Sequence, residues 1–159
     1  MLYLLRSFTR GGSYLKVGYT GNLEKRMASY LTENPGRELV GIRGGDMKDE
    51  TRMHLFLEAL GCKAGFLDEW FLDNPLVLEK FHESTKRIDK LIWKNRDLLF
   101  TGLDFSRQGY KVQIYEDLRF LFKDTPATGK IDQEWRAWNM SREIQARKKL
   151  IEEGWLEFV

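Results

Sequence analysis

The pattern of hydrophobic and polar positions in the first part of the chain predicts three short strands. Two β-prone runs, residues 2–5 and 14–19, flank a turn-rich stretch with two adjacent glycines, which is typical of a β-hairpin. A third β-prone run, residues 38–43, precedes another glycine pair. A shorter apolar run over residues 69–72 also has strand character.

Between and after these runs the hydrophobic period changes to that of helices. Asn22 is the expected N-cap of a helix over residues 22–31 that ends before an Asn-Pro-Gly break. Its apolar face consists of Leu23, Met27, Tyr30 and Leu31. A second helix is expected over residues 48–60, capped by Asp46 or Asp49. Its apolar face consists of Met53, Phe56, Leu57 and Leu60. Asn74 and Pro75 form an N-cap and N1 pair that opens a further helix.

The second half of the chain is mainly helical by the same criterion. The pattern predicts helices over residues 83–99, 116–122 and 133–153, with a loop over residues 101–110. Residues 111–115 have the composition of a short strand. We therefore expect a helical extension after a boundary near residue 82.

The composition of the chain is that of a folded globular protein without disulfides or membrane spans. Apolar residues make up 42% of the chain and aromatic residues 13%, which suffices for a folded core. The net charge is only +2, so a surface that binds phosphate has to be local. A single cysteine, Cys62, excludes an intramolecular disulfide and a cysteine-rich zinc site. The sequence has neither a signal peptide nor an apolar run of the ~20 residues that a membrane span needs, so we expect a cytoplasmic protein without membrane contact.

Three pieces of sequence stand in the order and spacing of a nuclease signature. The first is Leu2-Tyr3-Leu4, and the second runs from Lys16-Val17-Gly18 to Arg26. The third is Glu50-Thr-Arg-Met-His54, followed by Asp68-Glu-Trp-Phe71. Together they resemble the compact branch of the GIY-YIG nucleases. In that branch a Lys-Ile-Gly-like strand precedes an arginine helix, a helix with Glu and His, and a Glu-Trp-Phe strand. The resemblance covers residues 1–82.

This resemblance implies a role in phosphodiester hydrolysis for each motif residue. Glu50 matches the position that holds a divalent cation, Mg²⁺ or Mn²⁺, and Arg26 matches the arginine that stabilises the phosphate. Tyr3 matches the candidate base or water-positioning residue. Lys16 stands where the strict signature has a tyrosine, and it either assists the base or binds phosphate. Because Mg²⁺ keeps several of its waters, one carboxylate is chemically sufficient. His54 follows Glu50 by four residues on one helical face, and is either catalytic or a partly buried structural histidine.

Several neighbouring residues complete the candidate site. The expected substrate contacts are Tyr14, Tyr19, Tyr30 and Lys25. Tyr14 and Tyr19 are also alternatives for the base, and Glu58 is the alternative carboxylate.

The helical extension contains two groups of interleaved basic and aromatic residues. One surrounds Trp93, and the other extends from Trp135 to Lys149. Such groups are typical of surfaces that hold a phosphate backbone and stack on bases. The acidic residues among them favour the alternative, a solvated surface of an amphipathic helix.

We therefore expect an α+β fold with a small, three-stranded, largely antiparallel sheet flanked by helices over residues 1–82. A mainly helical extension over residues 83–159 follows. The expected function is that of a metal-dependent endonuclease that hydrolyses DNA, alone or as a homodimer. The alternative is a non-catalytic module of a phage or mobile-element assembly that binds nucleic acid or a phage or host protein.

Overall fold

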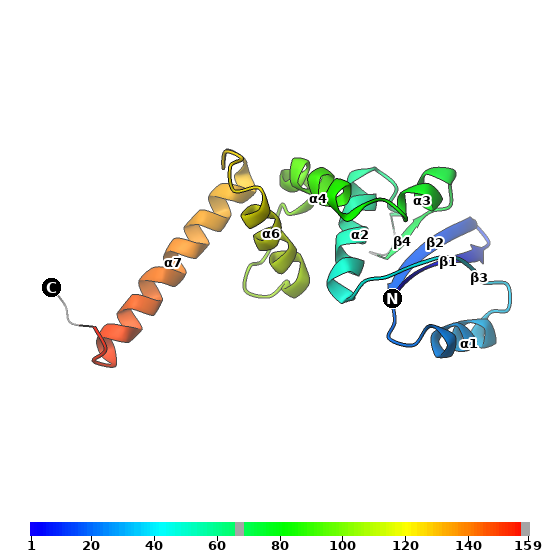
Figure 1. Cartoon of the computed structure of the whole chain (residues 1–159), viewed down its shortest axis with the longest axis horizontal. Helices are drawn as coiled ribbons and strands as arrows, with labels where there is room; N and C mark the ends of the chain where they lie inside the picture. The colour runs from blue at the N-terminus through cyan, green and yellow to red at the C-terminus, as the bar shows by residue number, and fades with distance from the viewer. Residues whose placement is uncertain (66–68, 157–159) are drawn as a thin grey trace.

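A four-stranded antiparallel sheet forms the first half of the molecule (Figure 1). The computed structural model describes residues 1–65 and 69–156. Its strands, in the spatial order β3-β1-β2-β4, are β1 (Leu2–Thr9), β2 (Gly12–Tyr19), β3 (Glu38–Arg43) and β4 (Trp70–Leu72). The predicted hairpin is confirmed as β1 and β2. The sheet has one strand more than the three expected, because the backbone of Trp70–Leu72 pairs with the edge of β2 at residues 14–16. Asp68, part of the third piece of the signature, lies outside the described residues.

β1 is buried on both of its faces because it lies inside the sheet and is covered from both sides. Leu2 and Leu4 belong to the main core cluster, which also contains Leu15 and Val17 of β2. Tyr3 alternates with these residues and therefore points to the opposite face, where it is only 2% exposed.

The predicted helix caps of the first half are confirmed. Helix α1 (Leu23–Glu33) begins at Asn22, whose side chain accepts a hydrogen bond from the backbone of Lys25. Helix α2 (Met47–Ala59) begins at Asp46, which forms a reciprocal capping box with Asp49. Helix α3 (Pro75–Lys80) begins at Asn74, with proline in its first turn.

Helix α2 lies between the sheet and the helices of the second half. Its predicted apolar residues Met53, Phe56 and Leu57 are buried, while Leu60 is partly buried. Leu55 is buried as well, since α2 also packs against α4 (Thr85–Lys94) on its other side. One hydrophobic cluster therefore continues across the expected boundary at residue 82, and the division into two domains stays a prediction.

The helical half differs from the expectation at two points. The expected helix over residues 83–99 is divided at Asn95 into α4 and the short α5 (Arg96–Leu99), and the Asn95 amide donates to the Leu91 carbonyl (2.8 Å). The strand expected over residues 111–115 was wrong, because these residues belong to α6 (Gly109–Leu121). Its buried residues recur with helical spacing and pack against α2 and α4, which overrides the local β-propensity.

Helix α7 (Lys130–Glu152) is held to the rest of the molecule through its first turn and then extends away from it (Figure 1). Asp132 is fully buried there and accepts hydrogen bonds from Tyr115 Oη (2.5 Å), Arg96 Nε (3.1 Å) and Arg119 Nη1 (3.2 Å). Beyond this turn, large apolar side chains such as Met140 are exposed. Among the described residues, no helix combines the length and the apolar character that crossing a membrane requires.

Candidate active site

Two tyrosines from distant elements meet on the outer face of the sheet. Tyr3 lies opposite Gly18 in the β1–β2 ladder, and its Oη is 2.8 Å from Tyr30 Oη of α1. A β-carbon built on Gly18 would lie 2.2 Å from Tyr3 Oη. Glycine at this position of the second motif therefore provides the space in which the Tyr3 ring lies.

Tyr30 occupies a strongly cationic environment. Its hydroxyl accepts a hydrogen bond from Lys16 Nζ (3.2 Å), since an ammonium group can only donate. Lys16 Nζ, Arg37 Cζ and Arg26 Cζ lie 5.2, 5.3 and 5.9 Å from the centroid of the Tyr30 ring. The sequence placed Lys16 and Arg26 in the site, but Arg37 lies in the connection after α1 and outside every motif.

The two tyrosines differ in acidity. Burial raises the pKa of Tyr3, and the hydrogen bond to Tyr30 and the proximity of that phenol raise it further. Burial also tends to raise the pKa of Tyr30, but the hydrogen bonds from Tyr3 and Lys16, with the charges of Lys16 and Arg26, outweigh burial and lower it. Tyr3 is therefore the phenol that keeps its proton more firmly, and Tyr30, which accepts a hydrogen bond from Lys16, is the one that ionises more readily.

Glu50 and His54 of α2 reach the backbone of β2 at residues 17 and 19, next to its pairing with β4 at residues 14–16. The Val17 amide donates to the Glu69 carbonyl (3.1 Å). His54 Nε2 then donates to the Val17 carbonyl (2.9 Å), and a hydrogen bond from the Tyr19 backbone reaches the Glu50 carboxylate. The two side chains, one helical turn apart, thus form hydrogen bonds with backbone groups of β2.

His54 uses one of its two ring nitrogens in this contact. Because its Nε2 carries the proton that bonds Val17, this nitrogen is not free to bind a metal or to accept a proton. His54 Nε2 also lies 3.8 Å from Glu50 Oε1. The histidine thus links α2 to β2, and whether it is also catalytic stays a prediction.

A second carboxylate, Glu69, approaches the same place. Its Oε1 lies 3.5 Å from Lys16 Nζ, and its charge acts on Glu50. Burial is the main reason that the pKa of Glu50 is raised, and Glu69 raises it further, although His54, the Tyr19 backbone and Lys16 oppose the change. Glu69 is not among the site residues that the sequence predicts, although its position before Trp70 and Phe71 in the motif is a signal that could have found it.

Arg26 lies on the exposed side of α1, beside a small cavity. The cavity has a volume of about 320 Å³ and is lined by Thr20, Asn22, Lys25, Arg26 and Ser29. Thr20 and Asn22 shape the turn that leads into α1, since Thr20 Oγ1 bonds both the amide and the carbonyl of Asn22 (3.1 Å each). Lys25 and Arg26 therefore present two cationic side chains at one polar surface.

Three predicted residues lie apart from the two tyrosine hydroxyls. Tyr14 is near the hairpin turn, with its hydroxyl 3.8 Å from the β-carbon position of Gly11. The Tyr19 side chain packs against the core, so that its backbone rather than its phenol reaches Glu50. Glu58 lies two turns after Glu50 and pairs with Lys63 (3.9 Å).

The donor set fits a hydrated divalent cation. Within residues 1–65 and 69–156 no group of three or more His, Cys, Asp or Glu side chains could hold a metal. Glu50, however, is a half-buried carboxylate whose raised pKa indicates incomplete compensation of its negative charge, and Glu69 adds to that charge. Such a site favours a cation that retains most of its waters, as Mg²⁺ does.

Comparison with known proteins identifies no relative of this chain. The chain matches no protein-family model, and searches of the curated proteins and of the solved structures give no significant match. The functional interpretation therefore depends on the residues themselves and on the resemblance of their motifs.

Proposed function

We propose that this chain is a metal-dependent endonuclease that hydrolyses DNA phosphodiester bonds in the manner of the GIY-YIG nucleases it resembles. The observation that carries the proposal is the convergence of Tyr3, Lys16, Tyr30 and Arg26 near the Glu50 carboxylate. Hydrolysis needs a proton acceptor for the attacking water and positive charge for the phosphate. Both kinds of group lie within this one cluster.

Tyr30 is our candidate for the proton acceptor. A general base is effective when its pKa lies near the working pH, and the pKa of Tyr30 is the one that is lowered. In this scheme the Tyr30 phenolate accepts the proton of the attacking water at its Oη. In this scheme Tyr3, the motif candidate for the base, and Lys16, the motif candidate for assisting it, hold Tyr30 by hydrogen bonds that stabilise its charged form.

Arg26 is the candidate for the phosphate. Its guanidinium stands beside both the Tyr30 ring and the cavity that Lys25 also lines. Arginine presents several N–H donors in a planar arrangement that suits phosphate oxygens. A phosphate in this cavity would have Arg26 on the side of Tyr30 and Lys25 on the outer side.

Glu50 is the residue that would hold Mg²⁺ or Mn²⁺, with Glu69 as a second carboxylate. When bound, the cation would supply positive charge that stabilises the phosphate as it becomes more negative. His54 bonds the Val17 carbonyl one helical turn away, and the Tyr19 backbone bonds the Glu50 carboxylate, so Glu50 lies beside β2.

The direct test is cleavage of supercoiled plasmid in the presence of Mg²⁺ or Mn²⁺. We expect nicking by the wild type and its loss in Glu50→Gln and Arg26→Ala. Glu58→Gln is the matched control, because it removes a carboxylate of the same helix that pairs with Lys63. It should cleave like the wild type.

The outcomes separate the two candidate functions. If the wild type binds the plasmid but does not nick it with either metal, the non-catalytic binding module is the better description. Nicking that persists in Glu50→Gln would refute the metal assignment.

A further inference from the structure

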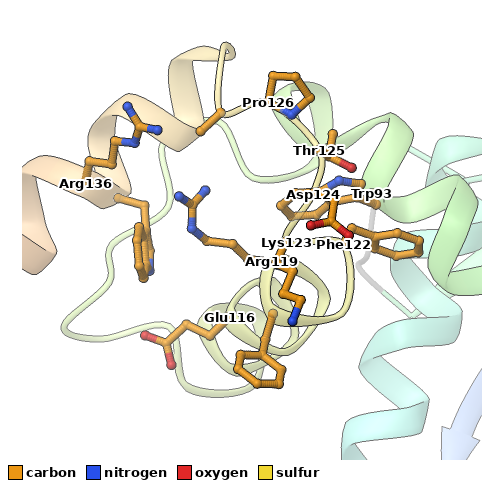
Figure 2. Close-up of a pocket in the computed structure, with 12 residues that line it drawn as sticks. Trp93, Glu116, Arg119, Phe122, Lys123, Asp124, Thr125, Pro126 and Arg136 are labelled. Atoms are coloured by element: carbon orange, nitrogen blue, oxygen red, sulfur yellow. The ribbon is translucent and has the colours of Figure 1, made fainter.

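A cavity outside the candidate active site lies between α6, α7 and the turn that connects them (Figure 2). Its volume is about 500 Å³, within the range of pockets that hold small organic ligands. In Figure 2 Arg119 projects from α6 toward the middle of this pocket, and Arg136 stands on α7 on its far side. We call this cavity the α6–α7 pocket.

The walls of the α6–α7 pocket contain flat side-chain groups, aromatic rings and a guanidinium group, that stack on one another. Arg119 Cζ lies 4.3 Å from the centroid of the Trp135 ring, and Phe122 stacks on Trp93 with ring centroids 6.0 Å apart. Phe120 stands at the rim with 81% of its surface exposed. Stacked aromatic and guanidinium planes are suited to a flat, heteroaromatic ligand.

The polar groups of the pocket favour an anionic ligand. Three basic residues, Arg119, Lys123 and Arg136, line it together with two acidic ones, Glu116 and Asp124. Arg119 is also held by the buried Asp132, which fixes its direction. Lys123 and Arg136 are exposed, so they are the cations best placed to reach a phosphate at the mouth.

The pocket walls also contain hydrogen-bond donors that are not used within the described chain. Trp93 Nε1 and Trp135 Nε1 are both buried, and neither has a hydrogen-bond partner among residues 1–65 and 69–156. A buried donor without a partner costs about 1–3 kcal/mol. Both tryptophans line the pocket, and a bound base carries ring nitrogens and carbonyls that are acceptors for such donors.

An open groove continues from the pocket. It has a volume of about 450 Å³ and shares Glu116 with the pocket. Phe105 and Trp138 stack there with centroids 5.3 Å apart, and Arg142 lies 4.5 Å over Trp138. The combination of an aromatic pair with a cation therefore recurs next to the pocket, where a second unit of a chain-like ligand would lie.

We infer that the α6–α7 pocket binds one nucleotide of a single-stranded nucleic acid, with the base against the aromatic walls and the phosphate near Lys123 and Arg136. A paired base in a duplex cannot enter a concave pocket, whereas an unpaired base can stack in it. This inference goes beyond the proposed function, since it concerns binding on the helical extension and needs no cleavage.

The test measures binding by the full chain in EDTA, using fluorescence anisotropy of a labelled oligothymidylate of about twelve nucleotides. The double variant Lys123→Ala/Arg136→Ala should bind about tenfold more weakly at low salt. Its matched control is Arg147→Ala/Lys148→Ala, which removes the same charge from the exposed part of α7 and should change affinity less than about twofold.

A second pair of variants tests stacking without any change of charge. Phe120→Ala should weaken binding about fivefold or more, as expected for loss of one base–aromatic contact. Leu121→Ala removes the neighbouring exposed apolar side chain, which does not line the pocket, and should leave affinity unchanged.

The outcomes distinguish this inference from the proposed function. The loss caused by Lys123→Ala/Arg136→Ala should persist in an Arg26→Ala background, whereas binding through the active site alone would depend only on Arg26. Equal effects of the pocket variants and their controls would overturn the inference. Tighter binding of an acidic peptide than of the oligonucleotide would also overturn it, and would identify a protein-docking site.

Discussion

Substitution of Gly18 by alanine tests the arrangement of the candidate active site most directly. The new β-carbon would lie 2.2 Å from Tyr3 Oη, 2.3 Å from Cζ and 2.8 Å from Cε2. These atoms belong to a ring that is only 2% exposed and bonded to Tyr30. The ring therefore has to withdraw by roughly 1–1.5 Å to reach van der Waals distance, which breaks the bond to Tyr30.

The size of the effect follows from these contacts. Overpacking a buried side chain costs about 1–3 kcal/mol, and loss of the hydrogen bond adds about 0.5–1.5 kcal/mol. For a chain of this size each kcal/mol lowers the melting temperature by about 2–4 °C, so we expect a decrease of roughly 5–15 °C. Nicking should fall by about a hundredfold, because displacement of catalytic groups by about 1 Å has effects of this order.

Thermal unfolding followed by circular dichroism, together with the plasmid assay, measures both effects. Gly21→Ala is the matched control, because a β-carbon there meets no atom of the described chain within 4 Å. In a double-mutant cycle, Tyr3→Leu should remove much of the cost of Gly18→Ala, since the two changes share one contact. If Gly18→Ala melts and nicks like Gly21→Ala, the placement of Tyr3 over Gly18 is wrong.

Four further predictions concern the candidate site and the anchor of α7. Glu50→Gln should abolish nicking without lowering the melting temperature at neutral pH. The pKa of Glu50 is raised in the folded state, so the protonated carboxyl stabilises the fold and this contribution is lost as pH rises and the group ionises. A neutral glutamine therefore removes no stabilising charge at neutral pH. Tyr30→Phe should reduce nicking by about 10²–10⁴-fold, and the rise of the wild-type rate with pH should disappear from its profile. Lys16→Met should shift that rise to higher pH, since Lys16 lowers the pKa of Tyr30; an unshifted profile would contradict Tyr30 as the base. Asp132→Asn should lower the free energy of unfolding, measured by urea denaturation, by about 3–5 kcal/mol, because it leaves Arg96 and Arg119 without the buried carboxylate they pair with. Tyr115→Phe removes only one hydrogen bond to Asp132 and should cost about 1 kcal/mol.

Part of the candidate site was accessible from the sequence because it is encoded in motifs with fixed spacing. Glu50 and His54 share a helical face, and both reach β2 as that spacing suggests. The pairing of Tyr30 with Lys16 was not accessible. It joins α1 to β2 through side chains that approach only after the sheet has formed. For the same reason the motifs indicated Tyr3 as the candidate base, whereas our proposal of Tyr30 needs the contacts of the folded chain.

The sequence by itself determined the features that arise from neighbouring residues. The hairpin around Gly12, the caps at Asn22, Asp46 and Asn74, and the buried face of α2 follow from turn chemistry, capping and period. Tertiary structure decided where local preference was weak or misleading. Residues 111–115 became helical because burial against α2 and α4 outweighed β-propensity. The short β4 joined the sheet because the edge of β2 needed partners for its backbone at residues 14–16, and Glu50 and His54 bond the β2 backbone at residues 17 and 19.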